Sequence, residues 1–132
     1  MIQIAPQMHI LVAVEPVDFR KGIDGLAAVC RNVIGEDPFS GYLFVFRNRR
    51  STAVKILIYD GQGYWLCQKR LSSGRFRFWP GERGELIHEV AAHELQLLVW
   101  NGNPASARVA QMWKKITGAD KTEPEKGHRL TG

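Results

Sequence analysis

The sequence has few of the features that mark a zinc protein, a secreted protein or a membrane protein. It contains only two cysteines in 132 residues and no CxxC pair, so the signatures of a zinc ribbon and of a thiol redox site are missing. No apolar run approaches the roughly 20 residues that a helix needs to cross a bilayer. The N-terminus also lacks a basic region followed by an apolar signal core. We therefore expect a cytoplasmic protein that does not bind membranes.

Acidic residues are nearly missing from one stretch of the chain, residues 47–77. This window holds eight Lys or Arg residues against a single acid, Asp60, whereas the rest of the chain has ten bases and twelve acids. The net charge of +5 therefore reflects a concentrated basic strip on a slightly acidic body. Such an asymmetry creates a field that attracts a polyanion. The basic strip consists of Arg47, Arg49, Arg50, Lys55, Lys69, Arg70, Arg75 and Arg77.

The length and the apolar content predict one globular domain. A chain of 132 residues with 45% hydrophobic residues can bury a substantial core. We expect this domain over residues 1–117 and a disordered tail over residues 118–132, because the tail has almost no apolar residues. Cys30 and Cys67 lie inside apolar runs, so we expect both to be buried free thiols.

Short runs rich in β-branched and aromatic residues, each bounded by Gly, Ser, Asn or Pro, predict strands. The runs are Tyr42–Phe46, Val54–Tyr59, Tyr64–Lys69 and Arg75–Trp79. Asp60–Gly63 offers glycines for a tight turn, so the second and third runs should form a hairpin. The apolar run Ile10–Val14 predicts a further, buried strand. Because side chains alternate along a strand, we expect one sheet face to be a core and the open face to carry cations beside aromatic rings.

Apolar residues at helical spacing predict a first helix from Asp18, as its N-cap, to Ile34, with Gly35 as its stop. Gly22 and Gly25 fit poorly inside such a helix, because a glycine there costs about 1 kcal/mol relative to alanine. Either the helix begins later than Asp18, or something approaches its backbone closely.

The second half of the chain predicts two more helices. One covers Ile87–Trp100 and ends before residues 101–104, whose Asn, Gly and Pro suit a helix terminus. A shorter one covers residues 109–116 and should pack on the body through Trp113. The expected fold is therefore α+β, with a mainly antiparallel sheet of about five strands and two to three packing helices.

The residue types that build catalytic and metal sites have structural explanations here. His88 and His93 are five residues apart, so on a helix their imidazoles would point roughly 140° apart and could not share one metal. Asp18 is expected to cap a helix and Asp60 to hold a turn. We expect no catalytic residues, no metal and no cofactor. A phosphoryl-transfer enzyme is an alternative only if the fold brings Asp18, Asp24 and Asp60 together.

The basic strip is the strongest functional signal, because arginine outnumbers lysine six to two in it and aromatic residues are interleaved. Arginine forks match phosphate oxygens, and aromatic faces stack on bases. We predict a nucleic-acid-binding surface in which the cations neutralise phosphates, Asn48 adds a hydrogen bond, and Trp79 or Tyr64 stacks or wedges. Its members are Arg47, Asn48, Arg49, Arg50, Lys55, Tyr64, Lys69, Arg70, Arg75, Arg77 and Trp79.

Arg20 and Lys21 form a second, smaller candidate. They precede Gly22 at an expected helix N-terminus, where outward N–H groups and two cations could bind one phosphate. The basic strip itself has two other interpretations. It could be a solvated charged face, or a protein-interaction surface, because arginine and aromatic side chains suit both kinds of partner. Duplex and single-stranded nucleic acid fit the pattern equally.

Several blocks of the sequence also follow a known order. They are DFRKGIDGL at 18–26, DPFSG at 37–41 with LFVFRNRR at 43–50, KIL at 55–57 with DGQG at 60–63, KRL at 69–71 and GRF at 74–76. Together they resemble the TnpB-type accessory proteins, encoded by the second open reading frame of bacterial insertion sequences of family sixty-six. The resemblance runs from about Val14 to Pro80, and the 95–103 segment is also similar. Residues 76–80 are one residue longer than in the usual pattern.

This resemblance implies a small bacterial protein encoded beside a separate transposase and needed for efficient transposition. It implies no catalytic activity of its own, because the transposase supplies the acidic catalytic residues. The expected partners are DNA, the transposase and another accessory protein of the element.

Overall fold

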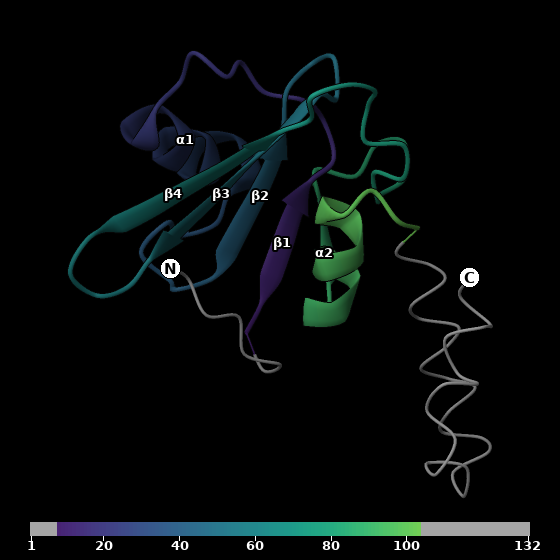
Figure 1. Cartoon of the computed structure of the whole chain (residues 1–132). Helices are drawn as coiled ribbons and strands as arrows, with labels where there is room; N and C mark the ends of the chain where they lie inside the picture. Colours follow the sequence, from purple (N-terminus) through teal and green to yellow (C-terminus); the bar gives the residue numbers. More distant parts are fainter. Residues whose placement is uncertain (1–7, 104–132) are drawn as a thin grey trace, which may run out of the picture.

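A five-stranded sheet of order β4-β3-β2-β1-β5 runs through the middle of the protein. The computed structural model describes residues 8–103 (Figure 1). The strands are β1 (Ile10–Ala13), β2 (Leu43–Arg47), β3 (Ala53–Tyr59), β4 (Tyr64–Arg70) and β5 (Ile87–Val90). Only β1 and β2 are parallel, and the other three pairings are antiparallel. The expected α+β fold with a mainly antiparallel sheet is confirmed.

The parallel pair is joined by a helical crossover that starts later than Asp18. Helix α1 (Ile23–Val29) continues as a π-helical turn, η1 (Cys30–Ile34), and ends at Gly35, whose φ of 82° suits glycine. The N-cap is Gly22, whereas Asp18 lies in the preceding loop. The prediction of Asp18 as N-cap is therefore wrong, and the later helix start explains why Gly22 is tolerated.

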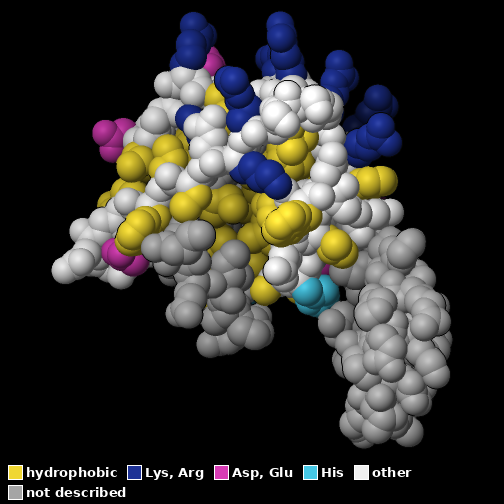
Figure 2. All heavy atoms as spheres, in the orientation of Figure 1, with side chains coloured by type: hydrophobic (Ala, Val, Ile, Leu, Met, Phe, Trp, Pro, Cys, Tyr) yellow, Lys and Arg dark blue, Asp and Glu magenta, His cyan; other side chains and the backbone are white. Residues whose placement is uncertain are grey.

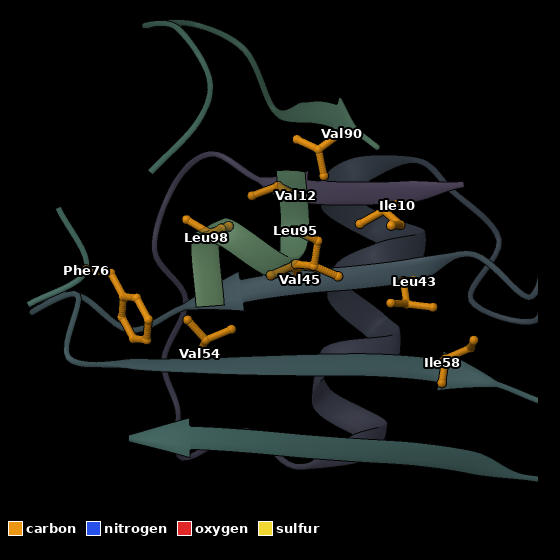
Figure 3. Packing of buried hydrophobic residues seen from close by; sticks show 10 residues of the cluster. All are labelled: Ile10, Val12, Leu43, Val45, Val54, Ile58, Phe76, Val90, Leu95 and Leu98. Carbon is orange, nitrogen blue, oxygen red and sulfur yellow. The ribbon is translucent and has the colours of Figure 1, made fainter. Parts of the chain in front are cut away.

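Two separate hydrophobic clusters cover the two faces of the sheet. On one face, α1 packs Leu26 and Ala27 against β1, β2 and β3. On the other face, Leu95 and Leu98 of α2 (Ala92–Val99) pack on β1 and β2, with Phe76 in the same cluster (Figure 3). Figure 1 accordingly shows α1 behind the sheet and α2 in front of it. The expected open sheet face covered with cations is therefore wrong.

Only the outer strand is left without helix cover on the α2 side. The cluster under α2 contains no residue of β4, and Trp65 of that strand is 44% exposed. The β3–β4 hairpin itself is confirmed. Its turn is closed by a hydrogen bond from the Asp60 N–H to the Gly63 carbonyl and by bonds from the Gln62 and Gly63 N–H groups to the Asp60 carboxylate.

The expected strand over Arg75–Trp79 is wrong, because this segment belongs to a loop that is held by turns and side chains. The Phe76 N–H donates to the Ser51 carbonyl. The side chain of Asn101 makes two further bonds: its Oδ1 accepts the Arg77 N–H, and its Nδ2 donates to the Arg75 carbonyl. The segment thus satisfies its backbone groups without joining the sheet.

The expected helix over Ile87–Trp100 is wrong in its first third, which is strand β5. Ile87 pairs with Ala13, and Val90 pairs with Ile10. Residues three apart share one face of a helix but lie on opposite faces of a strand, and Ile87 and Val90 indeed enter the clusters on the two sides of the sheet. The free side of β1, which the local pattern does not reveal, decided the outcome. The helix begins only after Ala91, whose N–H donates to the Glu94 carboxylate. The predicted third helix and the tail lie outside the described residues.

One glycine allows the loop after β4 to lie on the end of β1. Gly81 has φ of 108°, and a Cβ there would lie 2.4 Å from a methyl carbon of Val14. Gly84 has a similar φ of 93° but faces open space. Both conformations favour glycine, whereas only Gly81 is also needed for close packing.

We predict that Gly81→Ala destabilises the protein more than Gly84→Ala. Both substitutions strain the backbone by about 1–2 kcal/mol, and only the first adds overpacking of roughly 1–3 kcal/mol. Urea unfolding monitored by tryptophan fluorescence measures the difference. Equal losses in the two variants would contradict the packing role of Gly81.

Candidate nucleic-acid interface

The strand directions bring three loops together at one end of the sheet. Strands β1 and β2 end there, β4 also ends there, and β3 and β5 begin there. The loops are residues 14–22, 48–52 and 71–86. We call this part of the protein the basic end. Figure 2 shows the Lys and Arg side chains gathered along this edge of the molecule.

A cleft of about 460 Å³ joins two regions that the sequence analysis treats separately. One wall is the loop that leads to α1 and includes Arg20, and the other is the β2–β3 turn with Arg49 and Arg50. The cleft is lined by Pro16, Val17, Asp18, Phe19, Arg20, Asn48, Arg49 and Arg50. The smaller phosphate candidate and the basic strip therefore form one surface.

Arg20 is partly neutralised inside this cleft. Its Nη2 lies 2.7 Å from Asp18 Oδ2, and its Nε donates to the same carboxylate. The side-chain and backbone hydrogen bonds from Arg20 lower the pKa of Asp18 to about 2. Asp18 is thus ionised at neutral pH and offsets one cation. The excess positive charge of the cleft comes from Arg49 and Arg50, while Lys21 is exposed beside it.

Arg47 is a structural residue, contrary to the prediction that it contacts phosphate. Its Nη2 and Nε donate to the Val14 carbonyl at 2.9 and 3.3 Å, and its Nη1 donates to Ser51 Oγ at 2.9 Å. The guanidinium also lies over the Trp79 ring, 5.6 Å from its centroid. Burial lowers the pKa of Arg47. Arg47 therefore ties the end of β1 to the β2–β3 turn.

Trp79 and Tyr64 are not available for stacking on bases as predicted. Trp79 lies under Arg47 and donates its indole N–H to the Ala13 carbonyl at 2.8 Å. Tyr64 lies at the other end of the sheet, where its ring packs with Phe39 and Tyr59. Its hydroxyl is buried without a partner among the described residues, and burial raises the pKa of Tyr64.

Two lysines of the basic strip are also part of the scaffold. Lys55 is 7% exposed, and its ammonium donates to the Phe19 and Lys21 carbonyls at 2.9 and 3.0 Å. Lys69 donates to the Val99 carbonyl at 2.6 Å and lies over the Trp100 ring. This places a cation at the carbonyl end of α2, where the helix dipole favours it. The predicted phosphate contact is therefore wrong for the buried Lys55, whereas for Lys69, which is exposed, it stays a prediction.

Asn48 also has a local role in place of the predicted contact with nucleic acid. Its Oδ1 accepts hydrogen bonds from the Thr52 and Ala53 N–H groups at 2.8 and 3.1 Å, and its Nδ2 donates to Thr52 Oγ1. These bonds close the turn that carries Arg49 and Arg50. Asn48 therefore positions two arginines that point to solvent.

The remaining arginines of the basic strip are exposed, and their side chains make no recorded polar contact within residues 8–103. They are Arg49, Arg50, Arg70, Arg75 and Arg77. Asn101 fixes the backbone of Arg75 and Arg77, so two of these side chains project from an ordered loop. Arg83 on the same loop is also exposed. Arg83 lies outside the basic strip as the sequence defines it, because Glu82 and Glu85 flank it and dilute the local positive charge.

Phe78 is a second residue that the sequence analysis did not select. It is 40% exposed and lies in the same loop, next to Arg77. Alternation over FRFWP would place Phe76 and Phe78 on the same face, so only the loop structure, in which Phe76 is buried, reveals that Phe78 is exposed.

The acidic and histidine side chains of the described part of the chain meet only in pairs, such as His9 with Glu89 and His88 with Glu85. Asp60 accepts the Trp65 indole N–H and holds the β3–β4 turn, far along the sheet from Asp18. His88 lies on β5 and His93 on α2, so the helical geometry assumed for this pair is wrong. No group of three or more His, Cys, Asp or Glu within residues 8–103 could hold a metal ion, and no helix there could span a membrane.

A family of known proteins is similar to this chain across the whole described region. The model of the family described as IS66 Orf2-like protein matches residues 8–108. The uncharacterized protein y4jC of Sinorhizobium fredii (strain NBRC 101917 / NGR234) is 40% identical over 92 residues, which cover 70% of this chain and 77% of that protein. The uncharacterized protein y4hO of the same strain is 37% identical over 87 residues, with coverages of 66% and 75%. No solved structure matches the chain.

We predict that replacing Arg47 lowers the stability of the protein, whereas replacing the nearby Arg49 does not. Arg47→Ala should lower the free energy of unfolding by about 2–4 kcal/mol, because it leaves the Val14 carbonyl unpaired and uncovers Trp79. Arg49→Ala should change it by no more than about 0.5 kcal/mol. Urea unfolding of both variants provides the measurement, and a stable Arg47→Ala variant would show that Arg47 is not structural.

Proposed function

Because this chain belongs to the family of IS66 Orf2-like proteins, we propose that it assists transposition by binding DNA through its basic end. Membership of this family supports a role accessory to transposition. The observation that carries the finer proposal is the gathering of the free arginines. Loops that are far apart in sequence meet at one end of the sheet and place Arg49, Arg50, Arg70, Arg75 and Arg77 there with their side chains exposed.

Free arginines on ordered loops suit phosphate contacts. Each guanidinium can donate two parallel hydrogen bonds to one phosphate. The other members of the basic strip, Arg47, Lys55 and Lys69, hold the loops in place through carbonyl contacts. Phosphate contacts fix position and orientation on DNA without reading its sequence. The proposed binding is therefore mainly independent of sequence and depends strongly on salt.

The cleft gives the surface one defined contact point. Arg49 and Arg50 face the loop of Arg20 across the cleft. Arg20 binds Asp18 through Nε and Nη2, so its Nη1 takes no part in these hydrogen bonds. A backbone phosphate at this point would meet guanidinium groups from two sides. Phe19 lines the cleft itself, and Phe78 is exposed beside Arg77 on the loop after β4.

The proposed role has no catalytic step. Asp18 is engaged by Arg20, and Asp60 is engaged by its own turn and by Trp65. These contacts support a protein that acts on DNA by binding, with the chemistry supplied by a separate transposase.

A protein-interaction module is a second candidate, and one observation favours it. Val33 and Phe39 are 57% and 55% exposed and lie away from the basic end. Apolar side chains of this kind are enriched where proteins dock. Co-purification of the transposase that survives nuclease treatment and is lost in Phe39→Ser, but not in Arg49→Ala/Arg50→Ala, would support this candidate.

We predict that the protein binds a short labelled duplex with an affinity that falls steeply with salt. Each phosphate contact contributes about 0.9 to the slope of log K against log salt concentration for duplex DNA. The double variant Arg49→Ala/Arg50→Ala should therefore weaken binding at low salt and flatten the slope by roughly 2. Fluorescence anisotropy over a salt series, with the matching single strand in parallel, measures both effects.

Arg31→Ala is the control for the loss of charge, because Arg31 is exposed on η1, away from the basic end. It should leave the slope unchanged. Binding that is independent of salt, or an equal effect of Arg31→Ala and Arg50→Ala, would overturn the proposed phosphate surface.

A further inference from the structure

Strand β4 forms an edge of the sheet that no described segment covers. It is seven residues long, contains no proline, and pairs with β3 without a bulge from Tyr59–Tyr64 to Ala53–Arg70. No backbone hydrogen bond within residues 8–103 reaches its outer side. Natural sheets usually protect such an edge with a short strand, a bulge, a proline or a covering loop. The edge of β4 has none of these among the described residues, and the charged side chains that can also protect an edge, Lys69 and Arg70, lie only at its last two positions.

Two hydrogen bonds show which backbone groups of β4 point outward. The Asp60 N–H donates to the Gly63 carbonyl at one end of the hairpin, and the Leu71 N–H donates to the Thr52 carbonyl at the other. Bonded and non-bonded pairs alternate between these ends in an antiparallel ladder. The residues bonded to β3 are Trp65, Cys67 and Lys69. The residues with outward N–H and C=O groups are Tyr64, Leu66, Gln68 and Arg70.

The charge along β4 is arranged for pairing with itself in the antiparallel direction. The strand begins with Tyr64 and Trp65, next to the acidic Asp60, and it ends with Lys69 and Arg70. A parallel neighbour would place cations beside cations, which is unfavourable. An antiparallel copy would place the aromatic and acidic end of one strand beside the cationic end of the other, where cation–aromatic pairs are favourable.

We propose that two copies of this chain join through β4, in antiparallel register centred on Cys67. In this register all seven residues of the strand are paired. Trp65 faces Lys69 of the second copy, Tyr64 faces Arg70 of the second copy, and Leu66 faces Gln68 of the second copy. In this register, every outward N–H and C=O group of β4 lies opposite an outward group of the other strand. All free backbone groups along this edge can therefore form hydrogen bonds.

The two Cys67 residues face each other at the twofold axis of this dimer. Because Cys67 is bonded inward to β3, this central pair is a non-hydrogen-bonded one, with Cα atoms about 4.5 Å apart. This spacing allows a disulfide. Cys67 is partly exposed, whereas Cys30 is buried at 0% exposure. Any cross-link between native chains should therefore pass through Cys67.

The dimer has ten strands in one continuous sheet, and its two basic ends point in opposite directions along the strands. This follows because β4 runs towards the basic end in each copy. If the basic ends bind DNA as proposed above, the dimer would hold two DNA segments on opposite sides. This consequence rests on the proposed function, but the proposed dimer is independent of it.

The first experiment measures the mass and the cross-linking of the full chain. Light scattering after gel filtration at tens of micromolar should give twice the chain mass of 14.9 kDa. Oxidation by copper phenanthroline and oxygen should yield a reducible dimer in the native protein and in Cys30→Ser, and none in Cys67→Ser. A mass of 14.9 kDa together with no Cys67 cross-link would overturn the proposal.

Two substitutions of Gln68 then test the edge itself. Gln68→Pro removes an outward N–H that β3 does not use, so the hairpin should persist while the dimer becomes a monomer. Gln68→Ala keeps the N–H and should remain a dimer. A folded Gln68→Pro variant of dimer mass would contradict the proposal. The DNA salt series on this variant separates the two proposals, because each monomer keeps its basic end.

Discussion

The parallel pairing of β1 and β2 is the constraint on which the rest of the structure depends. Parallel neighbours need a crossover, which α1 and η1 provide, and both strands must then end on the same side of the sheet. The antiparallel β3, β4 and β5 add their own termini to that side. Without the crossover, the loop of Arg20 and the turn of Arg49 would lie at opposite ends of the sheet, and the cleft between them could not form.

The cations of the basic strip divide into two kinds that differ in what their N–H groups contact. Arg47, Lys55 and Lys69 donate to backbone carbonyls in loops and at a helix end, and each of the three also lies over an aromatic ring. The others point to solvent. A cation that donates to backbone carbonyls, as Lys55 does to two and Arg47 and Lys69 to one each, orders the segments around it. The structural cations therefore hold the exposed ones in position.

Much of the fold could be predicted from the sequence, because its signals are local. Runs of β-branched residues identified β1 to β4, and the glycines after Asp60 identified the hairpin turn. The errors arose where a partner far along the chain decided the structure. Ile87–Val90 became a strand because β1 had a free side, and the loop of Phe76 was held by Ser51 and Asn101. The basic strip remains a prediction as a binding surface, and sequence alone could not separate Arg47, whose carbonyl partner is thirty-three residues away, from Arg49.

The separation of charge along the strands also affects how the protein meets a partner. The free arginines outnumber Glu15, Glu82 and Glu85 at the basic end, and Asp37, Asp60 and Glu89 lie towards the other end. The molecule is therefore an electric dipole whose axis follows the sheet. Within a Debye length of roughly 10 Å from a polyanion, the field of the polyanion exerts a torque on this dipole. The torque orients the protein so that the basic end approaches first. Association would then be end-on, and the long side of the molecule formed by β4 would stay clear of the nucleic acid.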